Sequence, residues 1–178
     1  MADIVTEARV SRSTFYELFR DKESCFLAAF DAILSTFLTD LIRACEQPEL
    51  SWAERVRAGL EVMLNFLAAE PAFAHMCMVD MIFAGPRARE RYTAAVRVLI
   101  TYVERGRAES AHGERLPNSL AAAIVGGGAV VIRDEILDGR TERLGELLPD
   151  LLYLTLAPYL GQAEAMRAIQ RPPALRVA

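Results

Sequence analysis

The sequence contains little of the chemistry on which most enzymes and metal sites depend. Its 178 residues include 2 histidines and 3 cysteines, and neither histidine lies at metal-ligand spacing from a cysteine or from the other histidine. The sequence motifs of serine hydrolases, P-loop proteins and dinucleotide-binding proteins are missing. An odd number of cysteines without paired spacing is typical of reduced thiols in the core of a cytosolic protein. We therefore predict no metal, no cofactor and no enzymatic activity.

Long apolar runs, glycine and proline are also scarce. No charge-free apolar run is long enough to span a bilayer, and the first fifteen residues lack the apolar segment of a signal peptide. We therefore expect no membrane partner and a cytoplasmic location. The 10 glycines and 8 prolines are few beside the abundant alanine, leucine and valine, and this composition predicts an all-α fold. With 53% hydrophobic and 25% charged residues, the chain can bury a substantial core.

Apolar residues recur at helical spacing between turn residues along the whole chain. They predict helices over 2–8, 11–19, 51–70, 72–83, 87–110 and 119–137, a long helix from residue 21 or 24 to about 47, and a last helix from 141. Ser51 and Glu54 have the spacing of a capping box. Residues 171–178, which include two adjacent prolines, are expected to form a tail.

The first twenty-five residues contain the most specific pattern. Residues 4–23 read I-V-T-E-A-R-V-S-R-S-T-F-Y-E-L-F-R-D-K-E. Two short helices joined at Arg9 are what a helix-turn-helix needs. Ser11 is a suitable N-cap for the second helix, and Phe15 and Phe19 lie on one face of it, four residues apart.

This stretch resembles the second and third helices of the TetR-type transcriptional regulators, whose pattern runs I-A-x-x-A-G-V-S-x-x-T-F/L-Y-x-x-F-x-x-K-E. The resemblance implies an all-α protein with a partial helix-turn-helix domain at 1–23 and a helical effector-binding and dimerisation domain at 24–170. It also implies a further helix before Met1, and a turn at Arg9, where the family has glycine, that favours positive φ. The implied DNA contacts, to base edges or to phosphates, are Ser11, Arg12, Ser13, Thr14, Tyr16 and Lys22.

Residues 75–83, H-M-C-M-V-D-M-I-F, form an unusual cluster rich in methionine. Methionine adapts to irregular apolar cavities, so we predict that this cluster forms part of a pocket wall. The alternative is ordinary core packing for each methionine and a hydrogen-bonded core position for His75. A small hydrophobic or aromatic effector would fit a pocket lined by Met63, Phe66, His75, Met78, Met81, Ile82, Tyr92 and Tyr102.

The last two predicted helices have features of a helix–helix interface. Three consecutive glycines in the helix over 119–137 allow another helix to approach closely, and the following helix is apolar on all sides. In proteins of the TetR type the last two helices pair with their copies in a four-helix bundle. The resemblance therefore implies a homodimer with an interface at Gly126, Gly127, Gly128, Val131, Leu148 and Leu152.

These observations together predict a DNA-binding transcriptional regulator, a repressor that a small apolar ligand releases from a palindromic double-stranded operator. The net charge of -4, and a first segment with no excess of basic residues, support an alternative. In that alternative the chain is a helical dimeric sensor or adaptor module that does not bind DNA. An enzyme on a helical bundle has no group of catalytic residues to support it.

Overall fold

The computed structural model describes residues 2–171, and for residues 2–4 and 82 it describes the backbone alone. Every regular element in residues 2–171 is an α-helix or a 3₁₀-helix, which confirms the all-α prediction. The chain divides into two compact units, Met1–Thr36 and Phe37–Ala178. This division falls inside a long helix, beyond the border predicted at residue 23.

The first unit contains α1 (Ala2–Glu7), α2 (Arg12–Leu18) and the beginning of α3 (Lys22–Cys45). Ser11 caps α2 as predicted, because its hydroxyl accepts a hydrogen bond from the Thr14 amide at 3.0 Å. Arg9 lies in the turn before it with φ of 53°. This is the positive φ expected at that position, and it costs a residue other than glycine about 1 kcal/mol.

Helix α3 runs through both units. It begins where Asp21 and Ser24 exchange hydrogen bonds, with the Ser24 amide donating to Asp21 Oδ1 at 2.7 Å. Phe30 is buried in its first part, and Phe37 and Leu41 are buried in its second part. By length and composition α3 could cross a membrane, a test that the core helix of a soluble protein also passes.

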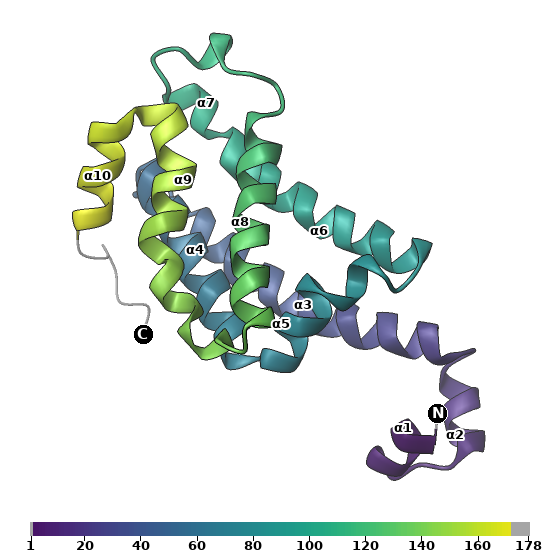
Figure 1. Cartoon of the computed structure of the whole chain (residues 1–178). Helices are drawn as coiled ribbons and strands as arrows, with labels where there is room; N and C mark the ends of the chain where they lie inside the picture. The colour runs from purple at the N-terminus through teal and green to yellow at the C-terminus, as the bar shows by residue number, and fades with distance from the viewer. Residues whose placement is uncertain (1, 172–178) are drawn as a thin grey trace. The chain divides into compact units, whose positions relative to one another are not determined.

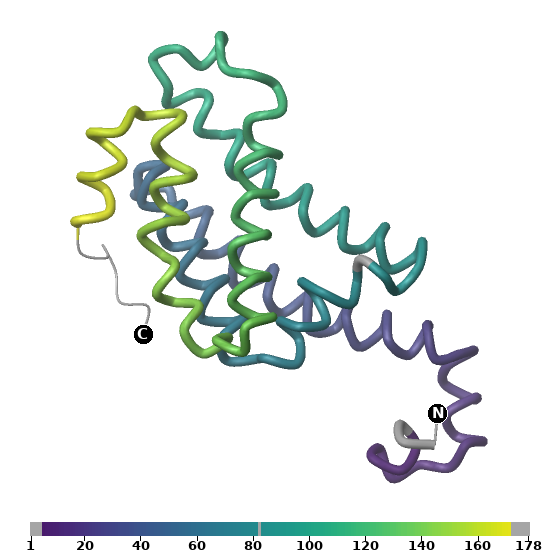
Figure 2. The backbone as a smooth tube through the Cα atoms, viewed as in Figure 1, coloured from purple at the N-terminus to yellow at the C-terminus, as the bar shows by residue number. Residues whose placement is uncertain are grey.

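The second unit is built from α4 (Trp52–Ala69), α5 (Pro71–Met78), η1 (Asp80–Ile82), α6 (Pro86–Glu104), α7 (Gly106–Glu109), η2 (Gly113–Arg115), α8 (Leu120–Leu137), η3 (Thr141–Leu147), α9 (Leu148–Leu160) and α10 (Gln162–Gln170). The predicted capping box of Ser51 and Glu54 starts α4. Helix α4 packs on α9 and α6 on α8, while α10 folds back along α9 (Figure 1). The backbone trace shows α8 and α9 side by side (Figure 2).

The core of this unit is centred on the single tryptophan, Trp52. Its indole N–H donates to the Tyr102 carbonyl oxygen at 3.2 Å, and its ring meets the Tyr159 ring at a centroid distance of 5.2 Å. Gly106 lies against the same indole, and a Cβ added there would come within 2.3 Å of the ring. The residues packed into this cluster are Trp52, Ile124, Leu152, Leu156, Tyr159 and Ala165.

Three predicted helices are divided in the structure. The helix predicted over 72–83 ends at Met78 and continues as the 3₁₀-helix η1, and the helix predicted over 87–110 breaks at Arg105. The last predicted helix consists of η3, α9 and α10, because Gly161, with φ of 83°, ends α9. Of the predicted tail, residues 172–178 lie outside the described residues.

Candidate nucleic-acid interface and ligand cavity

The exposed surface of α2 carries several hydrogen-bonding groups. Tyr16 is 58% exposed, and its ring stands at 89° to the buried Phe15 ring with a centroid distance of 5.5 Å. This contact holds the tyrosine ring in place while leaving most of it accessible. The hydroxyls of Ser11 and Thr14 lie 2.9 Å apart, and Ser13 donates to Glu17 at 3.4 Å.

Two cations of this surface have no partner within the described part of the chain. Arg12 and Lys22 are exposed, and neither forms a hydrogen bond or ion pair with another described residue. The carboxylate of Asp21, next to Lys22, instead accepts from the Ser24 amide and lies 3.8 Å from Arg20 Nε. The ammonium and the guanidinium are thus available to an anion such as a phosphate.

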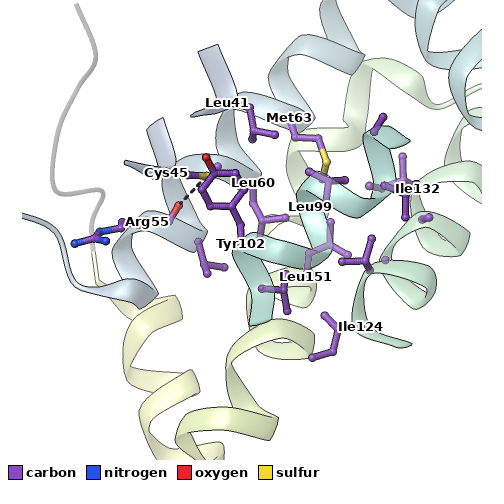
Figure 3. A pocket seen from close by; sticks show the side chains of 18 of the residues that line it. Leu41, Cys45, Arg55, Leu60, Met63, Leu99, Tyr102, Ile124, Ile132 and Leu151 are labelled. Carbon is purple, nitrogen blue, oxygen red and sulfur yellow. Dashed lines mark hydrogen bonds between the residues drawn. The ribbon is translucent and has the colours of Figure 1, made fainter. Parts of the chain in front are cut away.

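The second unit contains a cavity of about 210 Å³ that is partly open to solvent, shown in Figure 3. Its wall is formed by side chains from the end of α3 and from α4, α5, α6, α7, α8 and α9. Most of them are apolar, including Leu41, Leu60, Met63, Leu99, Ile124, Ile132 and Leu151. A wall of this composition, with a few polar groups, is typical of a site for a small organic molecule.

The two thiols and the Tyr92 phenol in the cavity wall are neutral at physiological pH. Burial raises the pKa of the Cys45 thiol to about 11 and that of the Cys77 thiol to about 11. Burial is also the main reason why the pKa of Tyr92 is raised. Both thiols and the phenol therefore keep their protons and add no negative charge to the cavity wall.

Charged groups gather at one end of the cavity. Tyr102 donates its hydroxyl to Glu46 Oε1 at 3.1 Å, and Arg105 donates to the same oxygen at 3.4 Å. The Arg105 guanidinium carbon lies 4.4 Å from the centroid of the Tyr102 ring, which adds a cation–π contact. Burial and the bond to Glu46 raise the pKa of Tyr102. Figure 3 shows the Tyr102 ring beside Cys45, while the guanidinium of Arg55 points away from the apolar side chains.

Half of the predicted pocket residues line this cavity. The residues that do so are Met63, Met78, Tyr92 and Tyr102. Phe66 does not, because its ring packs between Phe37 and Phe73 at centroid distances of 5.1 and 5.6 Å.

The other predicted residues lie on either side of the break in the helix after Met78. Met81 is fully buried away from the cavity, and the exposed His75 ring lies 3.2 Å from the Asp80 carboxylate. The side chain of Ile82 lies outside the described residues. The methionine-rich segment thus contributes Met78 and Cys77 to the wall, but not its whole length.

The predicted dimer residues lie on different sides of α8 and α9. Gly126 faces open space and Val131 is 39% exposed, whereas Leu148 is half-buried. Leu152 is 1% exposed within the core around Trp52, so it has no surface to offer a partner.

Two further glycines of α8 point toward their own chain. A Cβ on Gly127 would lie 3.8 Å from Leu154, and one on Gly128 would lie 3.4 Å from Leu151. Gly128 also lines the cavity. The outward face of α8 instead includes Val130 and Leu137, two exposed apolar side chains that were not predicted.

Sequence reasoning also missed several cavity residues. Gly59 lets α4 approach α3, because a Cβ there would lie 2.6 Å from Cys45 Sγ. Glu46 and Arg105 are brought together although 59 positions separate them. Each stands just after the end of a helix, but such a position does not indicate its partner. The pairing of Glu46 with Arg105 at this end of the cavity could therefore not be predicted from the local sequence.

The comparisons with known proteins bear on the first unit. The family model described as "Bacterial regulatory proteins, tetR family" matches residues 1–29, which contain α1, α2 and the start of α3. Neither curated proteins nor solved structures gave a match. In the part of the chain that the structure describes, no group of three or more His, Cys, Asp or Glu side chains is placed to hold a metal. Proteins of this family are regulators rather than enzymes, and the match favours DNA binding over the adaptor alternative. The N-terminal segment therefore carries a DNA-binding domain of the type described for the tetR family of bacterial regulatory proteins, and this domain indicates a DNA-binding transcriptional regulator.

Proposed function

We propose that the protein is a cytoplasmic repressor that works as a homodimer on a palindromic operator and leaves it when a small apolar ligand enters the cavity. The observation that carries this proposal is the course of α3. The helix begins directly after α2, and its last turns supply Leu41 and Cys45 to the cavity wall. A ligand in the cavity therefore touches the helix that continues into the DNA-binding unit.

In the proposed complex, α2 enters the major groove. Arg12 and Ser13, in its first turn, contact base edges, and arginine pairs with guanine through two hydrogen bonds. Ser11, Thr14, Tyr16 and Lys22 contact phosphates and fix the register of the protein on the duplex. The exposure of Tyr16, and the absence of any partner for the Lys22 ammonium among the described residues, support these roles.

The proposed dimer uses the outward face of α8 and the half-buried side chains of α9. Gly126 allows close approach there, and Val131 and Leu148 supply apolar contact area. A two-fold axis through this bundle would present two α2 helices about one DNA turn apart, roughly 34–36 Å. The ligand needs only a higher affinity for the conformation of α3 that misfits this spacing.

Selection of bound sequences from random double-stranded DNA tests the proposal. We expect enrichment of a palindrome whose half-sites are about one helical turn apart, roughly 10 bp. If no sequence is enriched, the assignment to operator binding is wrong.

Two substitutions test the phosphate contacts on the selected operator. Lys22→Gln should weaken binding and lower the slope of log affinity against log salt concentration by about 1, since one fewer counterion is released. Tyr16→Phe should weaken binding about tenfold through the lost hydroxyl. The control Arg115→Gln removes an exposed charge in the other unit and should leave affinity and slope unchanged. Equal effects of Lys22→Gln and the control would remove the assigned role.

The proposed interface is tested by sedimentation. The substitution Val131→Arg places a charge on the outward face of α8 and should convert the dimer to a monomer. Gln162→Arg, at an exposed position on α10, is the matched control and should leave the dimer intact. A wild-type chain that sediments as a monomer at micromolar concentration would contradict the proposal.

A further inference from the structure

The charged end of the cavity contains an arrangement that already receives a carboxylate. Two side chains that line the cavity, Tyr102 and Arg105, both donate to one oxygen, Glu46 Oε1, at 3.1 and 3.4 Å. Glu46 itself is not a lining residue. The convergence of a hydroxyl and a guanidinium on one carboxylate oxygen is the geometry with which proteins recognise anions. The carboxylate of Glu46 thus marks the position that the head group of a ligand would occupy.

The bond to Glu46 can be replaced at low cost. The side chains of Arg105 and Glu46 are 45% and 51% exposed, so water screens their attraction. Within the described residues Arg105 donates one hydrogen bond, although a guanidinium carries five N–H donors. The Tyr102 ring holds the guanidinium from one face by the cation–π contact at 4.4 Å. Arg105 is therefore fixed in position with donors to spare.

The rest of the cavity determines the body of the ligand. A volume of about 210 Å³ exceeds the roughly 150 Å³ that can hold a benzene molecule, so one ring or a short alkyl chain fits. Leu99, Ile132 and Met63 provide the apolar wall, and the neutral thiols of Cys45 and Cys77 add no charge. A compact apolar body with one polar head matches this distribution.

We propose that the cavity binds a small apolar carboxylate whose head group takes the place of Glu46 on Tyr102 and Arg105. This inference rests on the proposed function in placing the effector in this cavity. Glu46 directly follows α3 and is bonded to its last turn, because its backbone amide donates to the Ile42 carbonyl oxygen at 2.9 Å. Displacement of its side chain therefore affects the end of α3. The ligand head and the last turn of α3 compete for the same two donors, and this competition couples occupancy of the cavity to α3.

A cationic ligand fits the arrangement less well. Of the charged residues that line the cavity, Arg105 and Arg55 are basic and Glu109 is acidic. Arg55 already donates to the backbone carbonyl oxygens of Leu50 and Pro48. The face of the Tyr102 ring that attracts a cation is already covered by Arg105. A ligand ammonium would have to displace a guanidinium rather than a carboxylate.

Titration calorimetry of the full chain without DNA tests the inference with probes that differ in the head group. Octanoate, octanamide and octylamine share one body, and 3-phenylpropanoate with its amide supplies a second body. We expect at least one carboxylate to bind about tenfold more tightly than its amide, with octylamine weakest. Arg105→Gln should abolish the preference for the carboxylate and leave the affinity of the amide unchanged.

A second variant tests the displacement of Glu46. Glu46→Gln weakens the internal competitor and should tighten carboxylate binding by up to about fivefold, without a change for the amide. Glu49→Gln, an exposed glutamate three positions further on, is the control and should change neither affinity. Both glutamates are exposed, so the fold tolerates both substitutions, and circular dichroism verifies this.

The remaining outcomes separate this inference from the proposed function. Equal affinities of carboxylate and amide overturn the inference but leave a ligand cavity in place. Tighter binding of octylamine also overturns it. If none of the five probes binds at millimolar concentration, both the inference and the proposed role of the cavity fail. Failure of the DNA selection would refute the proposed repressor function and leave the calorimetric result standing.

Discussion

The contact between Gly59 and Cys45 predicts that alanine at position 59 has opposite effects on stability with and without the Cys45 sulfur. The substitution Gly59→Ala places a methyl group 2.6 Å from Cys45 Sγ, whereas ordinary contacts lie between 3.4 and 4 Å. The sulfur must move away, although it is buried and donates a hydrogen bond to the Arg55 carbonyl oxygen at 3.9 Å. Overpacking of this kind costs about 1–3 kcal/mol, and alanine regains about 1 kcal/mol of helix propensity.

The free energy of unfolding should therefore fall by about 0–2 kcal/mol in Gly59→Ala. In a Cys45→Ala background the sulfur is gone, and the nearest remaining atom is Leu41 Cδ1 at 3.5 Å, an ordinary contact. There the same substitution should stabilise the protein by about 1 kcal/mol. The coupling energy of the double-mutant cycle is then about 1–3 kcal/mol.

Urea unfolding followed by circular dichroism measures all four corners of this cycle. Gly145→Ala serves as a control, because a methyl group there meets no atom within 4 Å. It should be neutral or slightly stabilising in both backgrounds. If Gly59→Ala destabilises both backgrounds equally, the Cys45 sulfur does not limit the approach of α4 to α3, and the prediction is wrong.

Three further predictions concern stability. Because burial raises the pKa of Cys45 and of Cys77 from 9.0 to about 11, the folded state keeps protons on these thiols that the unfolded chain releases. The free energy of unfolding should therefore fall as pH rises from about 9 to 11, by roughly 2–3 kcal/mol for each thiol. In urea titrations, a variant with alanine at both positions should show a shallower decline. Ser51→Ala removes the capping box at the start of α4 and should cost about 1 kcal/mol of unfolding free energy, whereas Ser51→Thr should retain most of it. Gly106→Ala drives a methyl group into the indole of Trp52, a rigid ring, and should lower Tm by several degrees; an unchanged Tm would show that the two helices separate freely there.

Features that depend on neighbouring residues were predictable from the sequence. The caps at Ser11 and Ser51 follow from the residues on either side, whereas the positive φ at Arg9 was implied by the resemblance to the TetR type, which has glycine at that turn. The helices also follow, because their apolar periodicity is local. Leu18 shows the limit of this reasoning: it follows Phe15 at helical spacing, yet it is 71% exposed. Periodicity identifies an apolar face without showing how much of it is covered.

Features that depend on packing between distant segments were not predictable. The hydroxyl of Tyr102 reaches Glu46 across 56 positions, and no local pattern relates the two. Similarly, α9 is apolar on all sides, so its sequence does not distinguish Leu152, which is buried in its own chain, from a side chain available to a partner. The methionine-rich segment shows the same limit: Met81 was predicted to line the pocket, but it is buried outside the cavity wall.

The position of the single tryptophan has a practical consequence. Trp52 lines the cavity while its indole N–H is held by the Tyr102 carbonyl oxygen, and Tyr102 is one of the two donors at the charged end. The ultraviolet fluorescence of the indole therefore originates beside the cavity, and the sequence contains no second tryptophan to obscure it. Entry of a small molecule should shift or quench this emission, so that unlabelled protein can report its own occupancy and screen compounds directly.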